Sequence, residues 1–203
     1  VGISLAVLQQ LGGINVVFYY GAVLWQAVGF SEADALLINI ISGAVSILAC
    51  ITTLYFIDKV GRKPFLLVGS VGMSFSLIGL VVSFSNGELD AAGQLQLHEW
   101  GLFALIQATI YMFFFNLSWG PVMWVMLGEM FPNRLRGSGL AVAGLAQWLA
   151  NFIVTLTFPL LLTSLGLAIT YGFYTLGAII SVIFVVYKIR ETKGVSLEEM
   201  TEN

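Results

Sequence analysis

Long stretches without a charged side chain dominate this sequence and limit what the chain can fold into. Lys, Arg, Asp and Glu are absent from 1–31, 35–57, 64–87, 100–128 and 137–187. Only 9% of the 203 residues are charged and 59% are hydrophobic, whereas a soluble domain carries about 25% charged residues. Because a chain this poor in charge cannot solvate its own surface, we expect the uncharged stretches to lie in a lipid bilayer.

The lengths of these stretches predict six membrane-spanning helices. A helix needs about 20 apolar residues to cross the hydrocarbon core. The first four stretches hold one span each, and the fifth is long enough for two spans that join near 163–166. The stretches are continuously apolar and do not alternate, so helices are preferred to a barrel. We predict an all-α bundle over 1–187, with spans at 1–27, 35–57, 64–84, 100–128, 137–162 and 167–187.

The basic residues predict how the bundle is oriented. All eight lie within 59–63, 134–136 and 188–193, which follow spans two, four and six and so fall on one face. Loops rich in Lys and Arg stay in the cytoplasm. We therefore expect an integral protein of the cell membrane with both chain ends cytoplasmic. Residues 188–203 would form a cytoplasmic tail with a short helix that begins at Ser196.

The composition argues against several classes of function. The single cysteine, Cys50, excludes an internal disulfide, and the single histidine, His98, leaves little for a metal site or a catalytic base. His98 falls in an outer loop, and no expected span contains His, Lys or Asp. Eight basic residues and a net charge of −3 do not suit nucleic-acid binding. We expect no enzyme activity, no cofactor and no bound metal.

Polar side chains in the first span indicate a binding site. Gln9, Gln10 and Asn15 surround the pair Gly12-Gly13, and paired glycines weaken a helix and free its backbone groups. A broken helix at membrane depth often lines a binding cavity. Because amides donate and accept without carrying charge, they suit a neutral polyhydroxylated ligand. The alternative is that the same amides only hold helices together.

Spans four and five carry further groups of this kind. Gly120-Pro121 permits a kink in span four, and Trp119 and Trp124 lie beside it. A buried indole can stack on a sugar face, although packing alone would also explain it. In span five, Gln147 and Asn151 are four residues apart and therefore share one helix face.

Two cytoplasmic loops each place a carboxylate at a helix end, with arginine following. Asp58 precedes Arg62 between spans two and three, and Glu129 precedes Arg136 between spans four and five. Arginine suits paired contacts with a carboxylate. Ion pairs here would act as a conformational latch, although basic loops are also expected from orientation alone.

Together these motifs resemble the sugar-porter family of the major facilitator superfamily, which includes glucose and xylose transporters. The resemblance covers nearly the whole chain, as the C-terminal six-helix half of a twelve-helix transporter. It rests on four motifs: Gln9-Gln10 with Gly13-Ile14-Asn15 and Phe18-Tyr19-Tyr20; Asp58-x-x-Gly61-Arg62-Lys63; Gly120-Pro121-x-x-Trp124-x4-Glu129-x-Phe131-Pro132 with Arg136; and Glu191-Thr192-Lys193-Gly194 with Ser196-Leu197-Glu198-Glu199.

The resemblance implies a role for each matching residue. Sugar hydroxyls would be bound by Gln9, Gln10, Asn15, Trp124 and Gln147, in a cavity that is lined or flanked by Phe115, Gly120 and Asn151. Ser46 stands where many relatives have an asparagine that touches sugar. Tyr19 and Tyr20 would form an outer gate, and the cluster that locks the outward-facing state would comprise Asp58, Arg62, Glu129 and Arg136.

We therefore expect transmembrane transport of a monosaccharide, a hexose or a pentose, by alternating access. The sugar would lie near the bilayer midplane between this bundle and an N-terminal six-helix half of the same transporter. The chain starts at Val1 beside an apolar stretch, which suggests a piece of a longer polypeptide. A membrane sugar sensor that uses the same pocket and a polyol transporter are the alternatives. A proton is a candidate coupling ion.

Overall fold

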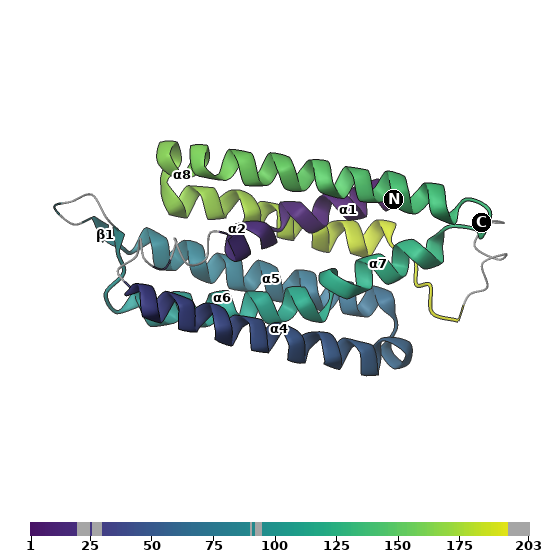
Figure 1. Ribbon diagram of the computed structural model, residues 1–203, viewed down its shortest axis with the longest axis horizontal. Coiled ribbons are helices and arrows are strands. Elements are labelled where there is room, and N and C mark those ends of the chain that lie inside the picture. The colour runs from purple at the N-terminus through teal and green to yellow at the C-terminus, as the bar shows by residue number, and fades with distance from the viewer. Residues whose placement is uncertain (20–24, 26–29, 90, 92–94, 195–203) are drawn as a thin grey trace.

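The computed structural model describes residues 1–19, 25, 30–89, 91 and 95–194. Its helices lie roughly along one axis and form a bundle (Figure 1). In chain order the elements are α1 (Gly2–Leu11), α2 (Ile14–Tyr19), α4 (Glu32–Val60), α5 (Arg62–Ser85), β1 (Glu88–Leu89), β2 (Leu95–Gln96), α6 (Trp100–Leu117), α7 (Trp119–Met130) and α8 (Arg136–Lys188). The two strands pair antiparallel in a small hairpin at one end of the bundle.

Within the described residues, four helical segments are long and apolar enough to cross a membrane. They are Glu32–Val60, Arg62–Ser85, Trp100–Met130 and Arg136–Lys188, and Gly2–Phe18 is a shorter apolar helix. The long helix α8 turns back on itself at Gly166, where φ is 78° and ψ is 172° (Figure 1). Its two arms lie antiparallel, so α8 can supply two crossings. The predicted first span, 1–27, lies partly outside the described residues, and the predicted tail helix from Ser196 lies wholly outside them.

Two helix breaks have clear local causes. Between α1 and α2, the backbone of Gly13 has a φ of 84°. Glycine adopts this left-handed conformation readily, whereas residues with a Cβ atom rarely do. Between α6 and α7, Pro121 has no N–H to donate to the carbonyl of Leu117, four residues earlier. The Oγ1 hydroxyl of Thr53 on α4 donates to that carbonyl at 2.5 Å instead. Each break thus frees backbone groups inside the bundle.

The interior and the exterior of the bundle are both apolar. Helix α5 packs against α6 and α8, and α1 packs against α8. The largest fully buried side chains include Trp119, Tyr111, Tyr171 and Phe158. Large apolar side chains also cover the outside, such as Leu54 and Phe75, each 72% exposed. An apolar exterior of this extent fits a bilayer and not water.

The segments that carry the basic residues meet at one end of the bundle, opposite the β1 hairpin (Figure 1). The Nζ of Lys63 donates to the carbonyl of Val186 at 3.0 Å, and the Nζ of Lys193 donates to the carbonyl of Lys59 at 2.5 Å. The α4–α5 junction is therefore tied to the end of α8. This end also holds the start of α1.

Candidate functional site

The three amides predicted to bind a ligand form one continuous hydrogen-bonded chain. Asn15 Nδ2 donates to Gln10 Oε1, and Gln10 Nε2 donates to Gln9 Oε1 at 3.1 Å. Gln9 Nε2 then donates to the carbonyl of Trp119 at 2.7 Å. Gln9 and Gln10 are only 4% and 2% exposed. The chain thus links the α1–α2 break to the first residue of α7 and brings the two broken helices together.

A side chain of α6 also hydrogen-bonds to the break between α1 and α2. The hydroxyl of Tyr111 donates to the carbonyl of Gly12 at 2.5 Å. Trp119 is anchored separately, because its Nε1 donates to the Oγ of Ser70 at 2.8 Å, and Ser70 accepts a second bond from Ser181. These buried polar contacts fix the positions of both breaks relative to α5 and α8.

Ser46 on α4 lies beside the break between α6 and α7. Its Oγ accepts a hydrogen bond from Asn116 Nδ2 at 3.0 Å. One turn further along α4, the Sγ of Cys50 lies 3.5 Å from the carbonyl of Asn116, to which it donates. The structure therefore brings Ser46 together with Asn116, a residue that the sequence did not single out.

The remaining predicted sugar contacts differ in exposure. Phe115 is buried and stacks on the ring of Tyr111, with ring centroids 6.5 Å apart. Gly120 lies close to Phe115, since a Cβ there would be 3.5 Å from the Phe115 carbonyl.

On the first arm of α8, Gln147 and Asn151 are each 8% exposed, and the Oε1 of Gln147 has no partner among the described residues. Trp124 on α7 is 41% exposed.

The predicted outer gate is only partly described. Tyr19 is the last residue of α2, but the described part of the structure does not include its side chain. Tyr20 lies outside the described residues. Their role as a gate stays a prediction.

Three of the four residues predicted to form a cytoplasmic lock are in contact. Arg62, the first residue of α5, lies 2.6 Å from Glu129 on α7 and 2.9 Å from Asp58 on α4. Its Nε also donates to Glu129 at 3.0 Å, so this pair is bidentate. Burial lowers the pKa of the Arg62 guanidinium, but its bonds to Glu129 and Asp58 outweigh that effect and raise the pKa overall. Arg62 therefore stays charged.

Arg136, the fourth member, makes no ion pair within the described chain. It begins α8, and its Nε is buried without a hydrogen-bond partner there. Its place in the lock stays a prediction.

Glu191, which the sequence placed only in a family motif, completes the cluster. Its carboxylate accepts from the backbone N–H groups of Arg62 at 2.9 Å and Lys63 at 3.0 Å, and so caps the start of α5. Burial alone would raise the pKa of Glu191, but the N–H groups of Lys193, Arg62, Lys63 and Thr192 hold the pKa below its usual value. The Thr192 hydroxyl donates to Glu129 at 2.6 Å. We call Arg62, Asp58, Glu129, Glu191 and Thr192 the ion-pair cluster.

The backbone shape explains why glycine precedes Arg62. Gly61 has a φ of 105°, and a Cβ there would lie 2.6 Å from a carboxylate oxygen of Glu191. Any larger residue would push Glu191 away from the start of α5. Because Arg62 and Glu191 are 129 positions apart, no local sequence pattern predicts this cap.

No group of three or more His, Cys, Asp or Glu side chains within the described residues could hold a metal ion. The polar side chains of the candidate site are instead neutral amides, the indoles of Trp119 and Trp124, the Tyr111 hydroxyl and serine hydroxyls. Such groups can donate hydrogen bonds to the hydroxyls of a ligand and accept hydrogen bonds from them.

Comparison with known proteins decides the family. The family model described as "Sugar (and other) transporter" matches residues 1–203. The chain belongs to this sugar transporter family, the sugar porters of the major facilitator superfamily. The predicted fold class, an all-α membrane protein that forms half of a major facilitator, is thereby confirmed.

Named sugar porters resemble the chain along nearly its whole length. The glucose transport protein of Synechocystis is 47% identical over 98% of this chain and 43% of its own length. The D-xylose transporter of Levilactobacillus brevis is 38% identical over 98% of this chain and 42% of its own. The chain thus spans less than half the length of these relatives. They are named as transporters, which agrees with the expectation that the chain is not an enzyme.

Solved structures of the xylose transporter XylE have the same fold. The structure bound to 6-bromo-6-deoxy-D-glucose matches with a TM-score of 0.85 at 35% identity, covering 99% of this chain and 41% of that one. The inward-open structure of the Escherichia coli protein matches with a TM-score of 0.81 at 34% identity, covering 99% of this chain and 40% of that one. With the apolar helices, this makes the chain part of an integral membrane protein.

Proposed function

We propose that the chain is the C-terminal half of a transporter that moves a monosaccharide, a hexose or a pentose, across the cell membrane. The observation that carries the proposal is the buried chain of amides from Asn15 through Gln10 to Gln9 at two helix breaks. Uncharged donors and acceptors of this kind match the hydroxyls of a sugar. Relatives named as glucose and xylose transporters support this substrate class.

The sugar site would combine residues from both breaks and from α8. Gln9, Gln10 and Asn15 would hydrogen-bond the sugar hydroxyls by exchanging some of their present partners. Further contacts would come from Ser46, Phe115, Gly120, Trp124, Gln147 and Asn151. The unpartnered Oε1 of Gln147 supports this role, because a buried acceptor without a donor is costly unless a ligand supplies one. The exposed face of Trp124 would stack on the sugar ring.

The transporter would work by alternating access. The sugar would bind near the bilayer midplane between this half and an N-terminal half, and Tyr19 and Tyr20 would close over it from outside. Similarity to XylE structures that include an inward-open one supports this mechanism. The ion-pair cluster joins α4, α5 and α7 at the basic end of the bundle, which would face the cytoplasm with both ends of this chain. Arg136 would extend this lock to the other half.

Substitution of Gln10 tests the site directly. In the full-length protein, Gln10→Ala removes the middle member of the amide chain, so we expect D-glucose or D-xylose affinity to fall at least about tenfold, the effect of losing two hydrogen bonds. Affinity is measured by isothermal titration in detergent. Leu11→Ala, on the neighbouring 39% exposed side chain, is the matched control and should bind normally. Unchanged affinity in a folded Gln10→Ala protein would contradict the proposal.

A polyol is the second candidate substrate. The major myo-inositol transporter IolT of Bacillus subtilis is 35% identical over all of this chain and 41% of its own length. A cyclic polyol offers the same hydroxyls to the same amides, so the described side chains do not favour one over the other. Competition of D-glucose, D-xylose and myo-inositol for the same site distinguishes them by affinity. A sensor that uses this pocket would bind sugar without moving it.

A further inference from the structure

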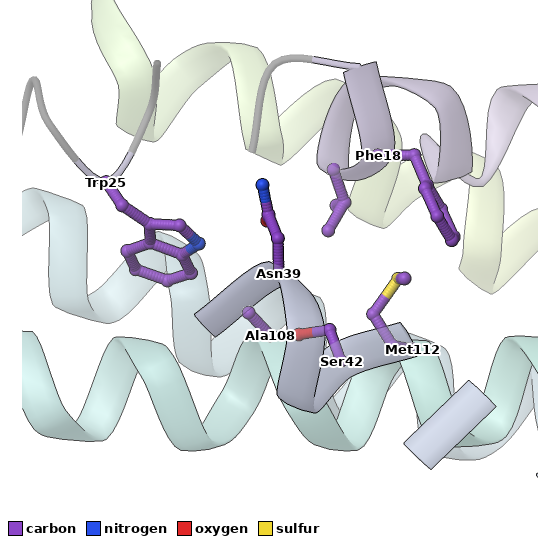
Figure 2. A pocket seen from close by; sticks show the side chains of 7 residues that line it. Phe18, Trp25, Asn39, Ser42, Ala108 and Met112 are labelled. Atoms are coloured by element: carbon purple, nitrogen blue, oxygen red, sulfur yellow. The ribbon is translucent and has the colours of Figure 1, made fainter. Parts of the chain in front are cut away.

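The helices around the candidate site are not all packed equally tightly. Figure 2 shows a cavity of about 140 Å³ between α2, α4 and α6. Its lining residues come from these three helices and from Trp25, and none of them belongs to α5 or α8. Where α5 meets the break between α6 and α7, the Ser118 side chain fills the position that a Cβ on Gly69 would need. The close support of this break therefore comes from α5.

A buried serine of α5 makes a contact that other serines of the same helix do not make. Ser74 and Ser76 each donate to the carbonyl four residues earlier in α5, a common partner for a serine within a helix. Within the described structure, the Oγ of Ser70 instead accepts from the Trp119 indole Nε1 at 2.8 Å and lies 2.9 Å from the Oγ of Ser181. Ser70 and Trp119 are both fully buried. Ser70 therefore joins the start of α7 to α5 and to the second arm of α8.

The break between α6 and α7 makes the start of α7 dependent on such a contact. Ser118, which separates the two helices, has a φ of −129° and a ψ of −85°, outside the helical region. The direction of α7 is therefore not set by α6. Trp119 is the first residue of α7, and its indole has a single N–H, which would be costly to bury without an acceptor. The bond to Ser70 thus holds the first residue of α7 in one place.

The same residue carries the last acceptor of the amide chain. Gln9 Nε2 donates to the carbonyl of Trp119 at 2.7 Å, and Gln9 Oε1 accepts from Gln10 at 3.1 Å. Because the amide group is planar, fixing its Nε2 also sets the direction of its Oε1 and of its second N–H. A displacement of Trp119 would therefore reach both glutamines that we propose as sugar ligands.

We propose that Ser70 is a positioning residue of the sugar site and that Ser181 supports it from α8. Ser70 does not touch the sugar; it holds Trp119 so that the Trp119 carbonyl orients Gln9 before a sugar arrives. A ligand that meets groups already in place binds more tightly, because less freedom is lost on binding. This inference rests on the proposed transport function and extends it to α5, which holds none of the predicted sugar ligands.

Ser70→Ala tests the proposal in the full-length protein. It removes the acceptor of the Trp119 indole, and we expect the affinity for D-glucose or D-xylose to fall about fivefold, the effect of one lost hydrogen bond. Ser76→Ala is the matched control, since Ser76 is equally buried and donates to the carbonyl of Gly72 on its own helix. Its affinity should equal that of the parent. Titration by saturation-transfer NMR measures these affinities, and a melting temperature is recorded for each variant.

Two further variants separate positioning from a purely structural role. Trp119→Phe removes the indole N–H and keeps an aromatic ring, so it should weaken affinity about as much as Ser70→Ala does. The double variant should also lose about fivefold, whereas two independent losses would multiply to about 25-fold. Gln9→Ala should weaken affinity at least as much as Ser70→Ala, because Ser70 acts through Gln9.

The double variant also keeps the test decisive if Ser70→Ala does not fold. It leaves no unpaired indole N–H, so it should fold, and removing both partners of a buried bond can be nearly neutral for stability. Its affinity should then equal that of Trp119→Phe. A further loss in the double variant would overturn the proposal.

The remaining outcomes are equally distinct. Ser70→Ala that lowers the melting temperature and keeps the parent affinity would assign Ser70 to structure only, which overturns the proposal. So would an equal loss of affinity in Ser76→Ala, or a loss in Ser70→Ala that exceeds the one in Gln9→Ala. A parent protein that binds neither sugar would instead contradict the proposed function.

Discussion

Gly13 shows how a single residue without a side chain holds the candidate site in shape. Its φ of 84° lets the chain turn between α1 and α2, and a Cβ added there would lie 2.9 Å from the Tyr174 ring. Gln10 and Asn15 lie on either side of this turn and are joined by a hydrogen bond across it. The conformation of Gly13 therefore sets the distance between two of the predicted sugar ligands.

Gly13→Ala should destabilise the full-length protein by about 2 kcal/mol or more, because a left-handed conformation costs a side chain about 1–2 kcal/mol and the methyl group also clashes with Tyr174. Sugar affinity should fall with it. Gly172→Ala on α8 is the control, since a Cβ there meets nothing within 4 Å. Thermal melting in detergent checks both. Equal melting temperatures for the two variants would contradict this account of the turn.

At the scale of elements, α4 supplies a hydrogen-bond donor that is missing at the break between α6 and α7. Thr53 is fully buried and donates to the Leu117 carbonyl that Pro121 leaves without a helical donor. Thr52, one residue earlier, donates only to Leu48 of its own helix. The two side chains are chemically identical, but only the Thr53 hydroxyl bonds a carbonyl of another helix. Thr52 is therefore a matched control for a substitution at Thr53.

Thr53→Val keeps the shape of the side chain and removes its hydroxyl, so the buried Leu117 carbonyl loses its donor. We expect a loss of about 1–3 kcal/mol in stability, the cost of an unsatisfied buried polar group. Thr52→Val should change stability by less than about 0.5 kcal/mol. Thermal melting of the two full-length variants measures the difference. A Thr53→Val protein as stable as Thr52→Val would mean that the break does not need α4.

Glu191 links a second pair of elements, since it caps α5 from beyond the end of α8. Its pKa in the folded protein is lowered, so the cap stabilises the fold above the ordinary Glu pKa of about 4.3 and is lost as the pH falls through the lowered value. Glu191→Gln should cost about 1 kcal/mol near pH 7, the usual size of a cap. Melting temperatures across pH 3–7 test this.

The stability difference between Glu191→Gln and the parent should shrink as the pH falls below about 4. Glu88→Gln, on exposed β1, is the control and should show no such difference at either pH. A Glu191→Gln effect that stays constant down to pH 3 would show that the charged carboxylate is not what caps α5.

The sequence predicts the fold better than it predicts the site. Charge-free stretches and the positions of Lys and Arg require only local counting, and they are enough to predict an all-helical membrane bundle. The bond from Gln9 to Trp119 joins residues 110 positions apart, and the one from Arg62 to Glu191 joins residues 129 apart. No local spacing encodes such contacts.

At the scale of the whole molecule, charged side chains hold one end of the bundle, whereas uncharged amides lie in its interior. The basic end is held by the ion-pair cluster, in which Arg62 bridges Asp58 and Glu129 from three helices. The amide chain reaches α7 at its first residue, Trp119, whereas Glu129 of the cluster lies near the other end of that helix. A charged end held by ion pairs and an uncharged interior would suit the alternating access that we propose, because each state must close one side of the site.

Uptake of radiolabelled sugar into proteoliposomes tests the central claim most directly. The full-length protein should take up D-glucose or D-xylose saturably, and an imposed pH gradient shows whether a proton moves with the sugar. Gln10→Ala should reduce uptake at low sugar concentration at least about tenfold, and Leu11→Ala should not. Saturable sugar uptake that depends on Gln10 is the result we predict. A protein that binds sugar without any uptake, or uptake that ignores Gln10, would contradict the account.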